Sequence, residues 1–269
     1  MYSVIIPSIG RINFLNELLE SIYNQSVKPN EIIILLDNNN SCKKGARFIN
    51  KKDKCKIIFC NRLNLSQKRN YGAHISESRY LIFSDDDDIW EFSKAELTIK
   101  SLNNSQVVCH EYSKFGALNQ NPKFLMGKKK KIITLIYLLF GSNIFGGGSA
   151  IAALKEIVLA IPFNEEYIFC EDYDWWIRII LAEVKIEYLP ISLVKYRVHN
   201  KNMTSNYTKI FNYNLKIFNK IIYKALILFS TYFIGSLRSF LNIFKKSIKL
   251  ICFQLIKKYS EFDHEKGKF

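Results

Sequence analysis

Short apolar runs alternate with helical segments four times in the first 84 residues, and this alternation restricts the fold more than any other feature. Each run is almost continuously apolar, which is typical of a strand buried on both faces of a parallel sheet. Repeated units of this length predict right-handed crossovers and an α/β fold, with a doubly wound, mostly parallel central sheet and helices on both faces. The runs are Ser3 to Pro7, Glu31 to Asp37, Lys56 to Cys60 and Tyr80 to Ser84.

The segments between and after these runs also show periodic patterns. Leu15, Leu18, Leu19 and Ile22 recur at helical spacing, so we expect a helix with one buried face before Pro29. Beyond residue 100 the alternation becomes irregular. The further expected elements are helices near 43–50, 66–76 and 153–158, a helix beginning near Glu171, and strands at 106–111 and 184–189.

Positive charge is concentrated near the end of the sequence. The chain has 39 basic and 24 acidic residues, a net charge of +15, which indicates a polyanionic partner. Residues 205–269 alone carry 12 basic and 3 acidic side chains. The sequence therefore predicts two parts, a catalytic or binding body over residues 1–204 and a basic, amphipathic helical extension over residues 205–269.

The basic extension interleaves ten lysine and arginine residues with aromatic and aliphatic ones between Lys209 and Lys258. Such a surface can lie on anionic lipid, although its apolar face can instead pack on the body. Its longest uncharged stretch, Ala225 to Leu237, is too short to span a bilayer, and the first residues lack the pattern of a signal peptide. We therefore expect a cytoplasmic protein, peripheral on the inner face of the cell membrane. No recognised nucleic-acid-binding motif accompanies the charge, so nucleic acid is not an expected partner.

Four consecutive aspartates, Asp85 to Asp88, follow the fourth apolar run. On extended backbone Asp85 and Asp87 point the same way, and like charges that close require a cation. Carboxylates, together with substrate phosphates, are preferred ligands of Mg²⁺ and Mn²⁺, so the pair suits a metal and diphosphate site. The alternative is that these acids cap the next helix. Because Ser93 to Glu96 supplies its own capping-box pattern, we prefer the metal site.

Two later clusters can contribute to the same site. Glu171 to Asp174 opens an amphipathic helix, where acids ordinarily stabilise the helix dipole. An enzyme that joins an alcohol to an activated carbon also needs a carboxylate base, and Asp172 is placed for that role if the fold brings it to the sheet edge. Near residue 197, Arg197 can neutralise phosphate and His199 can complete a metal shell, although such a cluster is also common on surfaces.

Taken in order, these segments resemble the family 2 inverting glycosyltransferases of GT-A fold, over about residues 1–204. The matching segments are Val4 to Ser8 with Gln25-Ser26, Glu31 to Asp37, Arg69 to Gly72, Phe83 to Trp90, Phe163 to Glu165, Glu171 to Asp174 and Tyr196 to His199.

The resemblance implies a nucleotide-sugar donor, with a UDP-sugar expected first, and Mn²⁺ or Mg²⁺ as cofactor. Asp85, Asp87 and His199 are the expected metal ligands, Asp172 the catalytic base, and the loop from Gly146 to Ser149 the border of the acceptor. The expected substrate-binding residues are Pro7, Ser8, Asp37, Arg69, Asp86, Glu171 and Arg197.

The sequence thus predicts a metal-dependent inverting glycosyltransferase that extends a bacterial surface glycan on a lipopolysaccharide, capsule or lipid-linked acceptor. One alternative is a nucleotidyltransferase, which would favour a glycine-rich, basic loop after the first strand, whereas this chain has only Ser8 to Arg11 there. Another is a non-catalytic module that binds sugar nucleotides or membranes. In such a module, Asp172→Asn would leave function intact.

Overall fold

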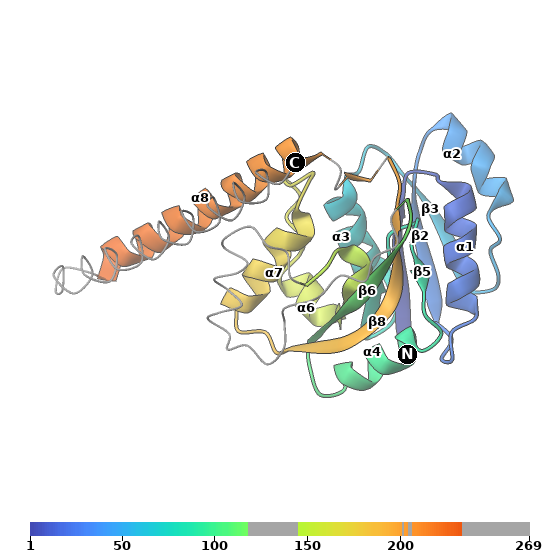
Figure 1. The fold of residues 1–269 in the computed structure, drawn as a ribbon, viewed down its shortest axis with the longest axis horizontal. Helices are drawn as coiled ribbons and strands as arrows, with labels where there is room; N and C mark the ends of the chain where they lie inside the picture. The colour runs from blue at the N-terminus through green and yellow to red at the C-terminus, as the bar shows by residue number, and fades with distance from the viewer. Residues whose placement is uncertain (118–144, 201, 204–205, 233–269) are drawn as a thin grey trace, which may run out of the picture. The chain divides into compact units, whose positions relative to one another are not determined.

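One eight-stranded sheet forms the centre of the structure, with strand order β3-β2-β1-β4-β7-β6-β8-β5 (Figure 1). The computed structural model describes residues 1–117, 145–200, 202–203 and 206–232. Strands β1 to β4 are parallel to one another, and β6 is parallel to β8, whereas β7 and β5 run antiparallel to their neighbours. The strands are β1 Tyr2–Ser8, β2 Glu31–Asp37, β3 Cys55–Cys60, β4 Tyr80–Phe83, β5 Ile89–Trp90, β6 Val107–Gly116, β7 Ile151–Leu154 and β8 Ile186–Val198.

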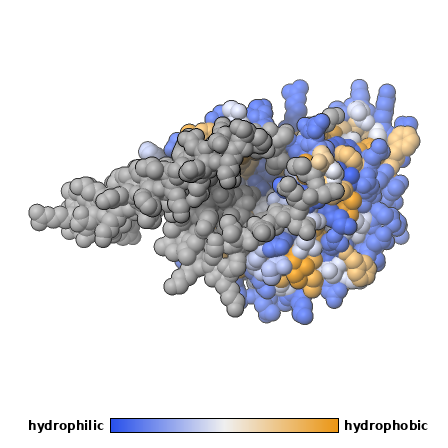
Figure 2. Space-filling model, in the orientation of Figure 1, coloured by the Kyte–Doolittle hydropathy of each residue, from blue (hydrophilic) through white to orange (hydrophobic). Residues whose placement is uncertain are grey.

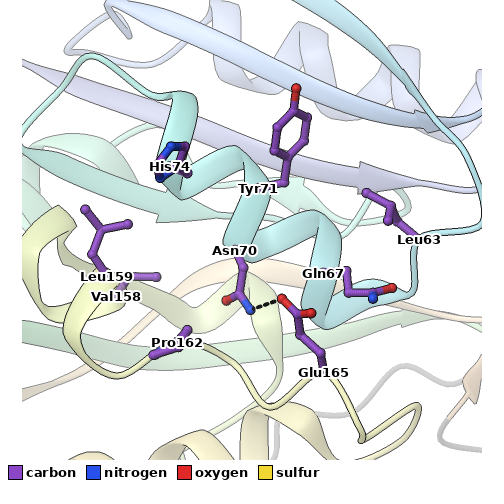
Figure 3. Close-up of a pocket in the computed structure, with 9 residues that line it drawn as sticks. All are labelled: Leu63, Gln67, Asn70, Tyr71, His74, Val158, Leu159, Pro162 and Glu165. Atoms are coloured by element: carbon purple, nitrogen blue, oxygen red, sulfur yellow. Dashed lines mark hydrogen bonds between the residues drawn. The ribbon is translucent and has the colours of Figure 1, made fainter.

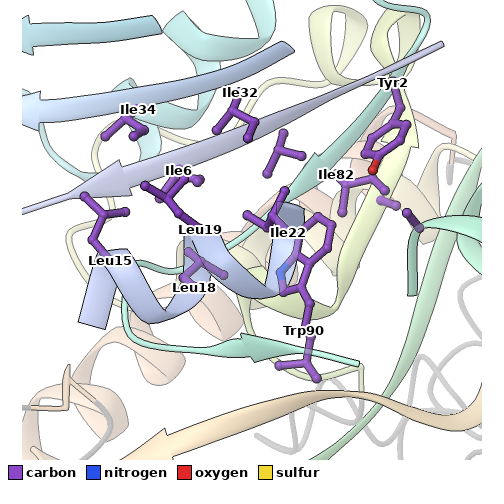
Figure 4. Packing of buried hydrophobic residues seen from close by; sticks show 14 of the residues in the cluster. Tyr2, Ile6, Leu15, Leu18, Leu19, Ile22, Ile32, Ile34, Ile82 and Trp90 are labelled. Atoms are coloured by element: carbon purple, nitrogen blue, oxygen red, sulfur yellow. The ribbon is translucent and has the colours of Figure 1, made fainter. Parts of the chain in front are cut away.

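Helices cover both faces of this sheet, as the sequence predicts. Alternate residues of a strand point to opposite faces, so Val4 and Ile6 face one side while Ile5 faces the other. On the first side they pack against the apolar face of α1, in a cluster that also includes α4 residues (Figure 4). The helices are α1 Ile12–Tyr23, α2 Asn40–Gly45, α3 Leu65–Ile75, α4 Lys94–Leu102, α6 Lys155–Ala160, α7 Glu171–Leu181 and α8 Tyr207–Tyr232.

On the opposite face, α3 approaches the sheet closely at Gly72. A Cβ atom at this position would lie 2.6 Å from Cγ2 of Ile5 and 2.9 Å from Cδ1 of Leu35. Only glycine allows the helix this approach without displacing the strand residues. The close contact fixes α3 against the strands, and with it the residues that α3 presents at the carboxyl ends of β1 and β2.

Several predictions differ from the structure, and three of the differences matter for the site. Residues 153–154 end strand β7, and the helix expected at 153–158 begins only at Lys155. Strand β8 continues to Val198, well beyond the predicted end at 189, because its backbone pairs with β6 along Tyr112 to Gly116. The aspartates after β4 lie on a turn at Asp86 and Asp87, not on extended backbone. Long-range strand pairing decides the first two differences, and the local pattern of the sequence does not contain it.

The described residues divide into two units, the first spanning Met1–Leu215 and the second beginning at Lys216. The expected boundary between residues 204 and 205 stays a prediction. Helix α8 confirms a helical start to the basic extension, whereas residues 233–269 lie outside the described residues. Within the described ranges, no helix is long and apolar enough to cross a membrane. On the face shown in Figure 2, hydrophilic residues cover most of the coloured surface and hydrophobic ones are scattered.

Candidate active site

A cavity of about 470 Å³ lies at the carboxyl ends of β1, β2 and β4. The first unit gathers most of the predicted site there, since the carboxyl ends of parallel strands meet at one edge, where open α/β sheets bind their ligands. All predicted site residues except Arg197 and His199 line it. Those in the wall are Pro7, Ser8, Asp37, Arg69, Asp85, Asp86, Asp87, Glu171 and Asp172, together with Gly147 and Gly148 of the predicted acceptor loop.

The aspartate turn is held by two arginines, Arg11 just before α1 and Arg69 in α3. Nη1 of Arg11 lies 2.5 Å from Oδ2 of Asp87, and Nε of Arg11 lies 2.9 Å from Oδ1 of Asp86. Asp85 instead accepts a hydrogen bond from Nη2 of Arg69 at 2.8 Å. Burial raises the pKa of the Asp87 carboxyl, Arg11 lowers it, and the neighbouring aspartates add to the rise. The turn thus gives Asp85 and Asp87 different partners, and the extended backbone expected for these aspartates is wrong, whereas their role as metal ligands stays a prediction.

His199 and Arg197 reach the aspartates from β8 and the residue that follows it, outside the cavity wall. Nε2 of His199 lies 2.9 Å from Oδ2 of Asp87, and the ring stacks on Phe14 with centroids 5.6 Å apart. Arg197 donates from Nε to the carbonyl of Asp87 at 2.8 Å and from its backbone N–H to Asp88 at 3.0 Å. Both residues thus hold the turn, and a direct contact of Arg197 with phosphate stays a prediction.

The donor atoms fit a divalent cation whose remaining ligands come from its substrate. Oδ2 of Asp87 and Nε2 of His199 are adjacent, and Asp85 lies in the same cavity wall. Among the described residues no group of three or more histidine, cysteine or acidic side chains is placed to hold a metal. Mg²⁺ commonly binds through one or two carboxylates and takes its other ligands from water and substrate phosphates. The set suits a metal that binds together with a diphosphate.

Asp172 lies in the first turn of α7, facing the glycine loop. A Cβ atom at Gly147 would lie 3.8 Å from Oδ2 of Asp172, so the loop passes directly beside the carboxylate. Burial raises the pKa of Asp172 to about 7, with Glu171 adding to the rise and Arg69 opposing it. Cys170, just before the helix, has φ of 60°, a conformation that is costly for a residue with a side chain and that is enriched at functional sites.

Arg69 joins α3 to both acidic clusters. Its side chain is 1% exposed, and it bridges Oε1 of Glu171 at 2.5 Å and Oδ1 of Asp85 at 2.8 Å. Burial lowers the pKa of Arg69, but the acidic neighbours, chiefly Asp85 and Glu171, raise it by more. The net shift of the pKa is upward, so the guanidinium stays charged. A Cβ atom at Gly148 would lie 2.0 Å from Nη2 of Arg69, so the glycine leaves the space that this arginine fills.

A buried lysine organises the end of the cavity predicted to bind the nucleotide. Lys68 is 3% exposed, donates to the carbonyl of Ser8 at 2.7 Å, and pairs with the carboxylate of Asp37. Oγ of Ser8 in turn donates to Oδ2 of Asp86 at 2.5 Å. This chain links β1, β2 and the aspartate turn through side chains that lie far apart in the sequence.

Sequence reasoning missed two positively charged residues of the site. Arg11 appears in the sequence only as part of the loop after the first strand, yet it pairs with two aspartates. Lys94 is fully buried and donates from Nζ to the carbonyl of Ser149 at 2.5 Å, and burial lowers its pKa to about 7. The position of Arg11 at the end of a parallel strand is a signal that could have identified it. For Lys94 the sequence shows only a charged residue at the start of a helix.

The sequence predicts the start of α4 only in part. Ser93 makes no side-chain capping hydrogen bond to α4, so the expected capping box is wrong. The capping box that the structure does contain joins Asn64 and Gln67 at the start of α3. Ser93 is nevertheless the residue that precedes the helix, and Asp85 to Asp88 do not occupy that position. The alternative role of these aspartates as helix caps therefore fails.

A second cavity, of about 420 Å³, lies between α3 and α6 (Figure 3). Asn70 donates from Nδ2 to Oε1 of Glu165 across it at 2.9 Å. None of the predicted site residues lines this cavity. The predicted site residues that line a cavity therefore all line the one at the strand ends.

Comparisons with known proteins show the family to which the chain is similar. The model of the family described as Glycosyl transferase family 2 matches residues 3–158. An uncharacterized glycosyltransferase of Methanocaldococcus jannaschii is 30% identical over 70% of this chain and 67% of its own length. The cholesterol galactosyltransferase of Borreliella burgdorferi is 26% identical over 70% of this chain.

The fold is shared with a solved structure as well. S. aureus TarS, residues 1–349, crystallised in complex with UDP, superposes with a TM-score of 0.57 at 16% identity, covering 81% of this chain. The chain spans 57% of the Borreliella protein and 64% of that TarS chain. The predicted resemblance is confirmed: the chain belongs to glycosyl transferase family 2 and is a glycosyltransferase.

Proposed function

We propose that this glycosyltransferase is metal-dependent and inverting, and that it moves a sugar from a nucleoside-diphosphate sugar to an acceptor hydroxyl. The observation that carries the proposal is one cavity whose wall includes both Asp172, a carboxyl of raised pKa, and the aspartates Asp85 and Asp87. Asp172 suits removal of a proton, and Asp85 and Asp87 suit binding of a metal and diphosphate, both of which this reaction requires.

In this proposal Asp172 accepts the proton of the acceptor hydroxyl while that oxygen attacks the anomeric carbon from the face opposite the diphosphate. The bond from the anomeric carbon to the diphosphate oxygen breaks, and the configuration inverts. A divalent cation held by Asp87, His199 and Asp85 would supply charge stabilisation for the leaving diphosphate. Ser8 and Asp37 would position the nucleotide at the far end of the cavity, where Lys68 fixes them.

The donor assignment can be tested by thermal unfolding with UDP, GDP, dTDP, CDP and CMP, each with and without Mn²⁺. We expect one nucleoside diphosphate, UDP first, to stabilise the protein only when Mn²⁺ is present. At about a hundred times the dissociation constant the gain is roughly 2.7 kcal/mol, or a rise of several degrees in Tm. UDP is the first candidate because the similar TarS structure holds it.

The matched variants are Asp87→Asn, which should abolish the shift, and Asp53→Asn, an exposed aspartate that lies outside the cavity and should preserve it. Stabilisation that is equal without Mn²⁺, or that survives in Asp87→Asn, would contradict the metal role. A shift by CMP equal to that by the diphosphates would contradict recognition of the diphosphate.

The acceptor we propose is a surface glycan under assembly, on a lipopolysaccharide, capsule or lipid-linked carrier, met at the inner face of the membrane. The relative from Borreliella is named for transfer to a lipid, cholesterol. Helix α8 carries the exposed lysines Lys209, Lys216 and Lys220 alongside Phe211, which is 65% exposed. Basic helices with exposed aromatic residues bind anionic bilayers through charge and apolar burial.

Vesicle sedimentation tests this peripheral binding. The full chain should bind vesicles of phosphatidylcholine mixed with phosphatidylglycerol, and bind pure phosphatidylcholine weakly. Each basic residue near the surface contributes about 1 kcal/mol, so replacing Lys209, Lys216 and Lys220 with glutamine should weaken binding roughly 100-fold. The control changes exposed lysines Lys43, Lys44 and Lys51 to glutamine in the first unit. Equal binding by both triple variants would contradict a role for α8.

A further inference from the structure

The side chain of Arg11 lies among ligands that suit a divalent cation. Its Nη1 is 2.5 Å from Oδ2 of Asp87 and 3.2 Å from Nε2 of His199, and its Nε is 2.9 Å from Oδ1 of Asp86. Oδ2 of Asp87 and Nε2 of His199 are two of the donors proposed above for the divalent cation, and both are atom types that Mn²⁺ accepts. The guanidinium therefore occupies the place among these atoms that a metal would need.

The guanidinium of Arg11 and a divalent metal ion cannot both contact Asp87 at this position. Oδ2 of Asp87 is the atom that touches both Arg11 and His199, so a metal bound there would displace Nη1 from hydrogen-bonding distance. The positive charges of the guanidinium and the metal ion would also repel each other strongly if both contacted one carboxylate in a partly buried site. The side chain of Arg11 is 25% exposed and lines the cavity, so it has space to turn toward a bound ligand.

The backbone around Arg11 favours an anion at the same place. Gly10 has φ of 94°, and a Cβ atom there would lie 2.5 Å from Sγ of Cys42, so this sharp turn requires glycine. Arg11 is the cap residue of α1, it makes no capping hydrogen bond, and the first turn of α1 has no acidic residue. The guanidinium thus adds positive charge at the amino end of α1, where the first turn contributes no acidic residue, and this combination suits phosphate oxygens.

We propose that Arg11 is an internal counter-cation of the metal site, which holds Asp86 and Asp87 in the donor-free protein and transfers to the donor diphosphate when the divalent cation binds. This inference rests on the metal-dependent function proposed above. It makes metal and nucleotide binding mutually dependent, since each removes an obstacle to the other, and this coupling is reciprocal. In the absence of nucleotide the protein should bind Mn²⁺ weakly.

The test is titration with Mn²⁺ alone, with free Mn²⁺ followed by its electron paramagnetic resonance signal. Arg11→Gln removes the competing charge and should bind Mn²⁺ at least about tenfold more tightly than the wild type. Adding UDP should strengthen Mn²⁺ binding by the wild type much more than by Arg11→Gln. The control is Arg178→Gln, because Arg178 pairs with Asp174 in α7 and not with the aspartate turn. This control should match the wild type.

Two further variants make the result specific. Arg11→Gln combined with Asp87→Asn should lose the gained Mn²⁺ affinity, because the gain depends on the carboxylate that Arg11 releases. Arg11→Lys retains the charge but not the fork that spans two carboxylates, so it should bind Mn²⁺ more tightly than the wild type and less tightly than Arg11→Gln.

The inference is overturned if Arg11→Gln and Arg11→Lys bind Mn²⁺ no more tightly than the wild type while the wild type still binds Mn²⁺ together with UDP. That result would leave the metal-dependent function intact. If the wild type binds Mn²⁺ neither alone nor with any nucleoside diphosphate, the proposed metal-dependent function itself is wrong, and the inference falls with it.

Discussion

Replacing Asp172 with asparagine should lower kcat by about 10²- to 10⁴-fold, while the donor still binds with nearly unchanged affinity. Asparagine keeps the shape of the side chain but cannot accept the hydroxyl proton, and a positioned general base contributes about this factor. The measurement is steady-state kinetics of sugar transfer beside thermal shifts with donor and Mn²⁺. A loss of kcat with donor binding retained separates chemistry from binding.

The pH dependence should identify the same group. Burial raises the pKa of Asp172 to about 7, and the base acts only when it is ionised. The kcat of the wild type should therefore rise about tenfold per pH unit below pH 7 and level off above it. In Asp172→Asn this limb should disappear. Because the folded protein holds the Asp172 proton to a higher pH than the unfolded chain does, ionisation opposes folding as pH rises toward 7, and the neutral variant should remain folded.

The matched control is Asp174→Asn on the same helix. Asp174 pairs with Arg178 and does not line the cavity, so this change should leave kcat close to that of the wild type. Equal losses in the two variants would point to damage to α7. Full activity of Asp172→Asn would mean that another group removes the proton.

The gathering of this site was predictable from the sequence because it follows from strand direction alone. Ser8 and Asp37 end parallel strands and Asp85 comes shortly after one, and parallel strands bring their carboxyl ends to one edge. Asp172 required more: the resemblance to a known family placed it at this edge, and the local pattern of α7 explains its acids equally well as stabilisers of the helix dipole.

The pairing of charges was not predictable in the same way. Which aspartate meets which arginine depends on the turn at Asp86 and Asp87, and four adjacent acidic residues give no indication of that turn. Lys68 illustrates the same limit. The apolar and polar residues of α3 are not clearly separated onto two faces, so the sequence does not show which side is buried. Only the packing of α3 shows that Lys68 is buried against Asp37. Strand direction locates a site, whereas its hydrogen bonds depend on tertiary packing.

Replacing Arg69 with methionine should cause the largest loss of stability among single changes in the site. The guanidinium is buried between Asp85 and Glu171, and removing one partner of a buried ion pair typically costs 3–5 kcal/mol because the remaining charges stay unpaired. At about 2–4 °C per kcal/mol, thermal unfolding should show a fall of roughly 6–20 °C in Tm. Activity should fall as well, since Asp85 loses the group that orients it.

A double-mutant cycle with Glu171→Gln separates unpaired charge from lost packing. If repulsion between unpaired carboxylates causes the loss, Arg69→Met with Glu171→Gln should be more stable than Arg69→Met alone, because the buried carboxylate of the pair becomes neutral. The exposed pair of Lys195 and Glu91, 3.5 Å apart, is the control, and Lys195→Met should change stability by no more than about 1 kcal/mol. If the double variant is as unstable as the sum of its single changes, Arg69 stabilises the fold mainly by filling the space beside Gly148 and Phe163, whose ring lies 5.4 Å from its guanidinium carbon.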